Sequence, residues 1–94
     1  MTILQIEHTI SSYEIWKKAF DNDPINRKKS GVKRYQIYRL NDNPHCVVID
    51  LYFGNVEDTQ NTLKALQKFW PNVPSNIMTN PKTRILDVVE SMDI

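Results

Sequence analysis

The side chain best suited to acid–base chemistry in this sequence is His8. It lies in an alternating stretch, residues 3–10, in which Leu4, Ile6, His8 and Ile10 share one face. An imidazole on such a face can act as a general base or bind a ligand, or it can be a hydrogen-bonded residue of the core. His8 is therefore the candidate catalytic residue, and both interpretations stay open.

Aromatic side chains recur in the same part of the chain and beyond it. Tyr13, Trp16 and Phe20 are spaced to fall on one face of a helix. Such rings can line an apolar pocket for a flat ligand, or they can simply fill a core. Tyrosine hydroxyls can in addition donate hydrogen bonds to a bound oxyanion or quinone-like group. The candidate ligand-binding residues are Trp16, Phe20, Tyr35, Tyr38 and Trp70.

Metal and phosphate chemistry have little support in the sequence. His45 and Cys46 are adjacent, but a zinc site needs four ligands, or three and a water. Haem would need His8 as its axial ligand, facing a large apolar cavity. The chain has only two glycines, Gly31 and Gly54, so it contains no glycine-rich phosphate loop. We therefore expect no metal and no cofactor.

Composition and charge set further limits. The 94 residues are the length of a single domain, residues 1–94, and they include one cysteine. No apolar run approaches the roughly 20 residues of a membrane span. The N-terminus does not read as an export signal, so we expect a cytoplasmic protein. The net charge is +1, but residues 17–39 hold eight basic and two acidic residues, a local +6. This basic stretch is either a solvated helix end or a patch for an anion.

The first half of the chain predicts a strand, a helical stretch and a second strand. The strand covers residues 3–10. The helical stretch runs from Ser11 to Gly31, with Ser11 and Glu14 spaced as a capping box. Pro24 should either kink it or divide it into two helical pieces. Gly31 fits a left-handed helix end. A second strand follows over residues 32–40.

The second half predicts a hairpin, a helix and a last strand. Turn residues at 41–44 join the second strand to an apolar strand at 46–53. Asn55 caps a second helix, whose apolar face comprises Val56, Leu63, Leu66 and Trp70. A loop with three prolines spans residues 71–81, and the last strand spans residues 83–90. The order is that of an α+β, ferredoxin-like β-α-β-β-α-β plait, with both helices on one face of a four-stranded antiparallel sheet.

The other face of this sheet is neither fully polar nor fully apolar. The third strand contributes Cys46, Val48, Asp50 and Tyr52 to it, and the first strand contributes Glu7 among others. An open apolar patch usually marks a partner, although the face can also stay exposed to solvent. Two sheets packed through these faces would form a homodimer. The predicted dimer face consists of Glu7, Val48, Asp50 and Tyr52.

One family resemblance rests on core and turn positions. They are Tyr13-x-x-Trp16-Lys17-x-x-Phe20-Asp21, then Arg27-x-x-x-Gly31-Val32-x-x-Tyr35, and then Arg39 followed by a polar turn into Val47-Val48-Ile49. Over residues 5–70 the pattern resembles the dimeric α+β barrel superfamily, which includes antibiotic-biosynthesis monooxygenase-like, cyclase-like and haem-degrading members. The resemblance implies that two subunits form a dimeric α+β barrel, with a small-molecule pocket between helices and sheet.

Two classes of function stay open. The first is a small-molecule-binding protein that acts as a cofactor-independent monooxygenase- or isomerase-like enzyme on an aromatic or polyketide-like substrate, with His8 as the base. The second is a non-catalytic structural or ligand-binding homodimer. RNA binding is disfavoured because residues 45–52 contain no glycine, lysine or arginine, and Asp50 would face phosphate. We thus expect a small hydrophobic or aromatic ligand, no nucleic acid and no membrane.

Overall fold

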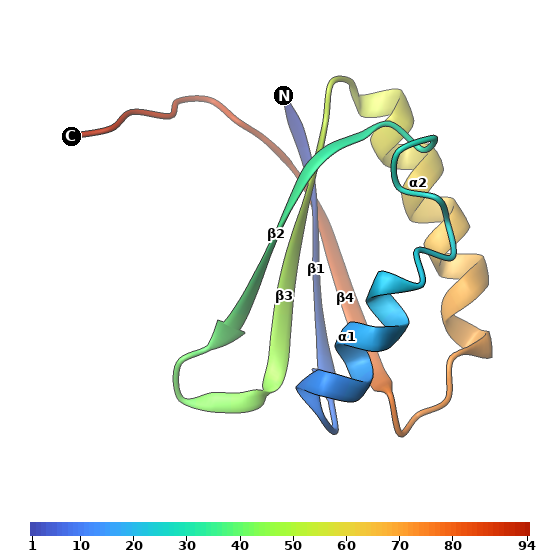
Figure 1. Ribbon diagram of the computed structural model, residues 1–94. Helices are drawn as coiled ribbons and strands as arrows, with labels where there is room; N and C mark the ends of the chain where they lie inside the picture. Colours follow the sequence, from blue (N-terminus) through green and yellow to red (C-terminus); the bar gives the residue numbers. More distant parts are fainter.

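The computed structural model describes residues 1–94. In chain order its elements are β1 (Thr2–Ile10), α1 (Tyr13–Asp21), β2 (Val32–Leu40), β3 (Asn43–Phe53), α2 (Val56–Phe69), the 3₁₀ helix η1 (Trp70–Asn72) and β4 (Met78–Asp87). The strands form one antiparallel sheet in the order β2-β3-β1-β4, and both helices cover the same face of it (Figure 1). The predicted ferredoxin-like α+β fold is confirmed. No helix is long and apolar enough to span a membrane.

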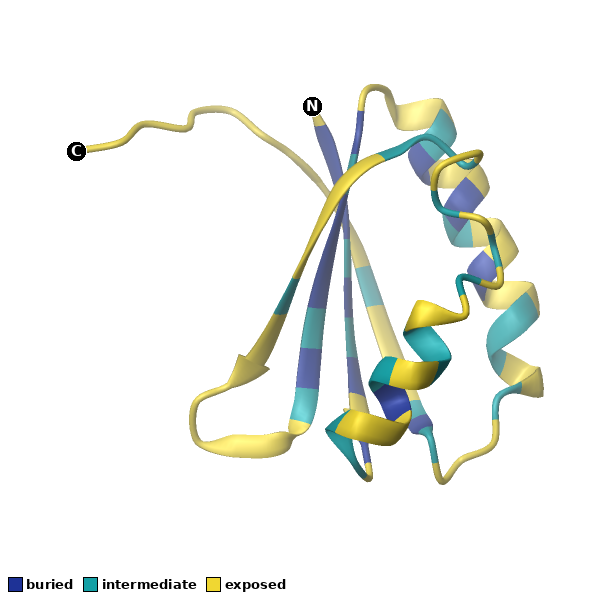
Figure 2. Ribbon diagram, viewed as in Figure 1, coloured by how far each residue is buried: buried dark blue, intermediate teal, exposed yellow.

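The core lies between the two central strands and the helices. β1 and β3 pair so that Leu4 is opposite Leu51, Ile6 is opposite Ile49 and His8 is opposite Val47. All six side chains are buried, and they alternate with less buried ones on the open face (Figure 2). The alternation predicted for residues 3–10 is therefore confirmed. The edge strand β2 is mostly exposed in this protomer.

The first helix begins one residue later than the sequence predicts. Ser12 is the N-cap, and its Oγ accepts a hydrogen bond from the backbone N–H of Ile15 at 3.4 Å. Ser11 instead donates its hydroxyl proton to the carbonyl oxygen of Asn76, in the loop before β4. The predicted capping box of Ser11 with Glu14 is therefore wrong. Either serine could cap the helix, but the hydroxyl of Ser11 is hydrogen-bonded to the loop before β4, so Ser12 is the cap.

The helical stretch also ends earlier than predicted. α1 stops at Asp21, and residues 22–31 form consecutive turns instead of a second helical piece. Asp23 and Asn26 adopt left-handed conformations, with φ of 52° and 53°. Pro24 disfavours the helical conformation of the residue before it and has no N–H to donate, which explains the break at Asp23. Pro24 therefore ends the helix, where a kink or a second helical piece was predicted.

Gly31 has the left-handed conformation that its position predicts, with a φ of +98°. A Cβ atom there would lie 2.5 Å from Oδ2 of Asp58 and 2.9 Å from its Cγ. We expect Gly31→Ala to lower the free energy of unfolding by about 1–3 kcal/mol, because it adds backbone strain to this clash. Urea unfolding measures the change. Gly54→Ala is the matched control, because its Cβ would meet only Lys33 Cε at 3.8 Å. Equal stability of the two variants would contradict this account.

The second helix starts as predicted and buries most of the predicted face, because Leu63 and Trp70 also pack against the core. The Oδ1 atom of Asn55 caps α2 by accepting from the backbone N–H of Asp58 at 2.8 Å. Leu66 is buried, as predicted, whereas Val56 is 49% exposed. Two threonines that were not predicted to be buried, Thr59 and Thr62, are buried on this helix. The Thr59 hydroxyl can be buried because it donates to the carbonyl oxygen of Asn55 at 2.9 Å.

The last strand begins five residues earlier than predicted, at Met78 instead of Thr83, and ends at Asp87. Met78 pairs with Ile10, and the register then shifts between Thr9 and Glu7. The irregularity contains Pro81 and follows Asn80, whose φ is 54°. A proline is tolerated here because β4 is an edge strand, where a missing N–H need not break a ladder. The predicted loop over residues 71–81 is therefore shorter, and it begins with the turn η1.

Candidate functional site

A cavity of about 260 Å³ lies between the helices and the covered face of the sheet. Its walls come from β1, β3, α1, α2 and the two connections that follow the helices. Most of the lining side chains are apolar, among them Ile6, Trp16, Phe20, Ile49, Leu66 and Phe69. The loop after α2 supplies Val73, Pro74 and Ile77. This part of the chain, in which the sequence predicts only a proline-rich loop, thus closes one side of the cavity.

The aromatic side chains of α1 form a continuous row, of which Trp16 and Phe20 line the cavity. The ring centroids of Tyr13 and Trp16 are 5.9 Å apart, and those of Trp16 and Phe20 are 5.2 Å apart at an interplanar angle of 30°. Trp16 is buried, with 3% exposure, while Trp70 approaches from η1. Three of the predicted ligand-binding residues, Trp16, Phe20 and Trp70, therefore line one cavity together with His8.

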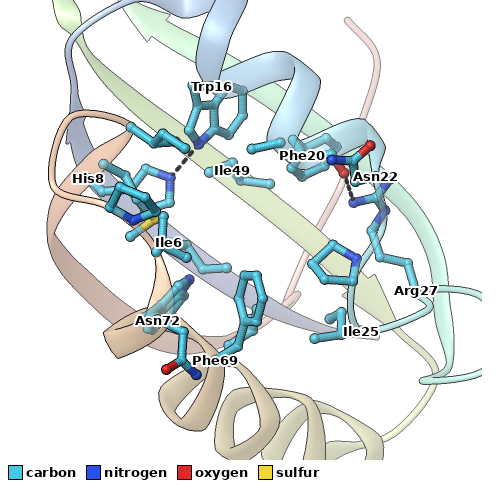
Figure 3. A pocket seen from close by; sticks show the side chains of 18 of the residues that line it. Ile6, His8, Trp16, Phe20, Asn22, Ile25, Arg27, Ile49, Phe69 and Asn72 are labelled. Atoms are coloured by element: carbon cyan, nitrogen blue, oxygen red, sulfur yellow. Dashed lines mark hydrogen bonds between the residues drawn. The ribbon is translucent and has the colours of Figure 1, made fainter.

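His8 belongs to the cavity wall, but both of its ring nitrogens are buried from water. The indole Nε1–H of Trp16 donates to His8 Nε2 at 3.0 Å (Figure 3). Because the indole can only donate, His8 is neutral and carries its proton on Nδ1. Nδ1 has no hydrogen-bond partner. Burial lowers the pKa of His8 to about 4, since the charged imidazolium would lose its hydration.

The polar residues at the other side of the cavity were not predicted as site residues. Figure 3 shows Asn22 and Arg27 across the cavity from His8 and Trp16. The turns after α1 place them there, and the sequence pattern alone predicts a helix through both positions. Of the eight basic residues in the stretch 17–39, only Arg27 lines this cavity. Asn72, a third polar residue of the wall, comes from η1.

The two tyrosines of β2 lie on opposite faces of the sheet. Tyr35 pairs with Leu51, which puts it on the helix side, and its ring meets that of Phe20 edge-on at 5.0 Å. Tyr38 pairs with Val48 on the open face, so the sheet separates it from the cavity. Tyr35 therefore supports the cavity from behind Phe20, and Tyr38 is removed from the candidate ligand-binding residues.

Tyr38 belongs instead to a polar cluster on the open face. Its hydroxyl donates to Asp50 Oδ2 at 2.8 Å, and Gln5 Nε2 donates to Asp50 Oδ1 at 2.9 Å. The hydrogen bond to Asp50 raises the pKa of Tyr38 to about 12. Asp50 is only 6% exposed although its face is open. Asp50 is therefore hydrogen-bonded by Tyr38 and Gln5 from the two neighbouring strands of its own chain.

The chain contains no group of three or more His, Cys, Asp or Glu residues arranged to hold a metal ion. His45 places Nδ1 3.2 Å from the carbonyl oxygen of Ile10. Cys46 is half-buried, and burial raises the pKa of its thiol, which makes it a poor nucleophile.

Several proteins of known structure share this fold. No family model matches the sequence, and no curated protein matches it. Among solved structures, a candidate antibiotic biosynthesis monooxygenase from Deinococcus radiodurans superposes with a TM-score of 0.68 at 14% identity, over 100% of this chain and 98% of the other. A dimeric ferredoxin-like protein from an uncultured marine organism gives a TM-score of 0.65 at 10% identity, over 97% of each chain. A candidate antibiotic biosynthesis monooxygenase from Nitrosomonas europaea gives 0.56 at 16% identity, over 90% of this chain and 88% of the other.

These similarities extend over nearly the whole chain and concern the fold. The protein shares the ferredoxin-like α+β fold of these structures. At such low identity the comparisons assign neither activity nor substrate to this chain.

Proposed function

We propose that this protein binds a small, flat, apolar molecule in the cavity between helices and sheet. The observation that carries the proposal is an apolar space of about 260 Å³ beside a row of aromatic rings. An apolar cavity of about 150 Å³ is enough to bind benzene, so this space has room for a fused bicyclic ring. Trp16 and Phe20 both line this space, so a flat ligand can contact their rings.

The tryptophans provide a direct readout of binding. The chain has two of them, Trp16 and Trp70, and both line the cavity. We expect 2-naphthol to change the intrinsic fluorescence in a saturable way. Ala19→Phe should weaken this binding by about tenfold or more, because Ala19 lines the cavity and a phenyl ring would occupy ligand space.

The matched control is Ala65→Phe, which adds the same ring to an exposed position of α2. It should bind 2-naphthol as the wild type does. If the wild type does not respond to 2-naphthol, or if Ala19→Phe and Ala65→Phe bind it equally well, the cavity is not the ligand site.

We further propose that the protein is a homodimer assembled through the open face of the sheet. The predicted dimer residues Glu7, Val48, Asp50 and Tyr52 all lie there. An apolar group of Ile3, Tyr52 and Leu86 adjoins them, because Ile3 pairs with both other residues. The face carries acidic residues on β1 and β3 and the basic residues Arg34, Lys82 and Arg84 on the outer strands. A face that carries both signs can pack against its own copy around a twofold axis.

Catalysis is the second candidate function, with His8 as the base of a cofactor-independent monooxygenase- or isomerase-like reaction on an aromatic or polyketide-like substrate. It is favoured by the position of a neutral imidazole in the cavity wall. Such a reaction would begin with removal of a proton from a substrate carbon. Nε2 is the nitrogen of the neutral ring that can accept a proton, and it already accepts a hydrogen bond from Trp16. That hydrogen bond would have to open before His8 could act as a base. A pKa of about 4 also makes His8 a weak base. We therefore rank ligand binding above catalysis.

A cytoplasmic location remains a prediction.

A further inference from the structure

We propose that the cavity selects apolar ligands that carry one carboxylate group, and that Arg27 and Asn22 bind this group at the cavity mouth. This inference rests on the proposed ligand-binding function and names the chemical class of the ligand. It starts from an imbalance in the cavity wall, which is apolar except for a few polar residues, of which only Arg27 carries a full charge.

The guanidinium of Arg27 is held in a fixed position. Its Nη1 donates to the carbonyl oxygen of Phe20 at 2.8 Å. Its Cζ lies 4.0 Å from the centre of the Phe20 ring and 5.2 Å from that of Tyr35. The side chain is only 16% exposed. A guanidinium has five N–H donors, so most of them remain available beyond the one that Phe20 uses. A planar cation held over a ring is well suited to a planar carboxylate.

The carboxylate of Asp23 does not occupy this donor set. The closest approach of Asp23 Oδ1 is 3.5 Å, to Arg27 Nε, which is long for a charged hydrogen bond. The same oxygen accepts from the backbone N–H of Arg27 at 2.8 Å, so its role is to shape the turn. The Asp23 side chain is 36% exposed and therefore partly solvated. Asp23 therefore weakens the positive electrostatic potential at Arg27 but does not neutralise it.

The surroundings define the rest of the ligand. Asn22 lies beside Arg27 at the same side of the cavity (Figure 3), and its amide can donate to a second carboxylate oxygen. The nearby Lys17 is not available, because it pairs with Asp21 at 2.6 Å on the outside of α1. With one cation and one amide, the site matches a single negative charge. An aromatic ring next to that carboxylate would extend over Phe20 toward Trp16.

The test compares two ligands of the same shape. 2-Naphthoate carries the carboxylate, and 2-naphthamide replaces it with a neutral amide. By tryptophan fluorescence we expect the wild type to bind 2-naphthoate about tenfold more tightly, the preference that one charged hydrogen bond supplies. Arg27→Gln should remove this preference and leave the binding of 2-naphthamide within about twofold. Lys28→Gln, which removes a neighbouring exposed charge outside the cavity wall, should keep it.

A second variant changes affinity in the opposite direction. Asp23→Asn keeps an oxygen that can accept from the Arg27 backbone, and asparagine tolerates the left-handed conformation of residue 23. It removes the competing charge, so 2-naphthoate should bind more tightly, by about threefold or more, with no gain for 2-naphthamide. This variant decides the question even if Arg27→Gln does not fold.

The outcomes separate the two proposals. If both naphthalenes bind equally well, and neither Arg27→Gln nor Asp23→Asn changes their ratio, the carboxylate site is wrong while the ligand cavity stands. If neither compound binds the wild type, the ligand-binding function itself fails and the carboxylate site with it. A preference that Lys28→Gln abolishes as fully as Arg27→Gln would also overturn the proposal, because it would show a diffuse charge effect.

Discussion

Replacing Val48 by lysine is expected to convert the proposed dimer into a monomer of 11.1 kDa. Val48 lies on the central strand β3, between Glu7 on β1 and Tyr38 on β2, in the middle of the open face. In a twofold dimer each copy would bury one added ammonium group in the interface. Burying two added charges in the interface should raise the dissociation constant by about a thousandfold or more.

Light scattering coupled to size exclusion measures this change. The wild type should elute with twice the protomer mass, and Val48→Lys with the protomer mass. Val48 is only half-buried in the protomer, so its lysine side chain can reach water and the variant should remain folded. Val56→Lys is the matched control, because Val56 is 49% exposed on the helix side of the molecule. A Val48→Lys variant that keeps the dimer mass would show that this face is not the interface.

The second large effect concerns His8 and acid. The pKa of His8 is about 4 in the folded protein and 6.5 in an unfolded chain. Between these values the unfolded state binds a proton that the folded state does not, so the free energy of unfolding falls as the pH falls from about 6.5 to about 4. The contribution of His8 is absent near neutral pH. It grows to a loss of about 2 kcal/mol at about pH 5 and about 3 kcal/mol at about pH 4.

Urea unfolding at several pH values isolates this contribution by comparison with His8→Gln. A glutamine can still accept from the Trp16 indole but does not titrate, so its stability should depend less on pH by those amounts. Carboxylates titrate in the same range, and they cancel in the difference between the two proteins. His45→Gln, which removes the exposed histidine, is the control. Parallel profiles of the wild type and His8→Gln would mean that His8 is not a buried neutral imidazole.

The parts of the fold that the sequence predicts are those fixed by local or periodic physics. Leu4, Ile6 and Ile10 alternate because a strand exposes successive side chains to opposite faces, and all three are buried on one side. Asn55 starts α2 because its side chain satisfies a free backbone N–H at the helix end. The turn between β2 and β3 follows from its residue types in the same way, but it is limited to residues 41–42, and β3 begins at Asn43, three residues earlier than predicted, because Asn43 pairs with Leu40.

The errors occur where distant contacts decide between local alternatives. Ser11 and Ser12 are equivalent as caps by type, and the contact between Ser11 and Asn76 selects Ser12. Thr59 can be buried because its hydroxyl forms a hydrogen bond at the start of its own helix, and a pattern of apolar residues does not predict the burial of a threonine. β4 starts early because Met78 finds Ile10 as its partner across the sheet.

The candidate site was only partly predictable for the same reason. His8, Trp16, Phe20 and Trp70 could be grouped, because strand and helix periodicity put them on faces that must meet. Arg27 reaches the cavity only because the chain leaves the helix at Asp23, and a sequence pattern that continues the helix places it elsewhere. Tyr38 was misplaced because the alternation in β2 is not marked by hydrophobicity.

The most direct test of the ligand cavity is an NMR titration that follows the two tryptophan indole N–H signals as 2-naphthol is added. Trp16 donates its indole proton to His8 within the cavity wall, and Trp70 lies in η1. We predict that both signals shift with one common dissociation constant, while side-chain signals of Gln36 and Tyr38, on the other face of the sheet, stay in place. Indole signals that remain unchanged at saturating 2-naphthol, or shifts confined to the open face, would contradict the account.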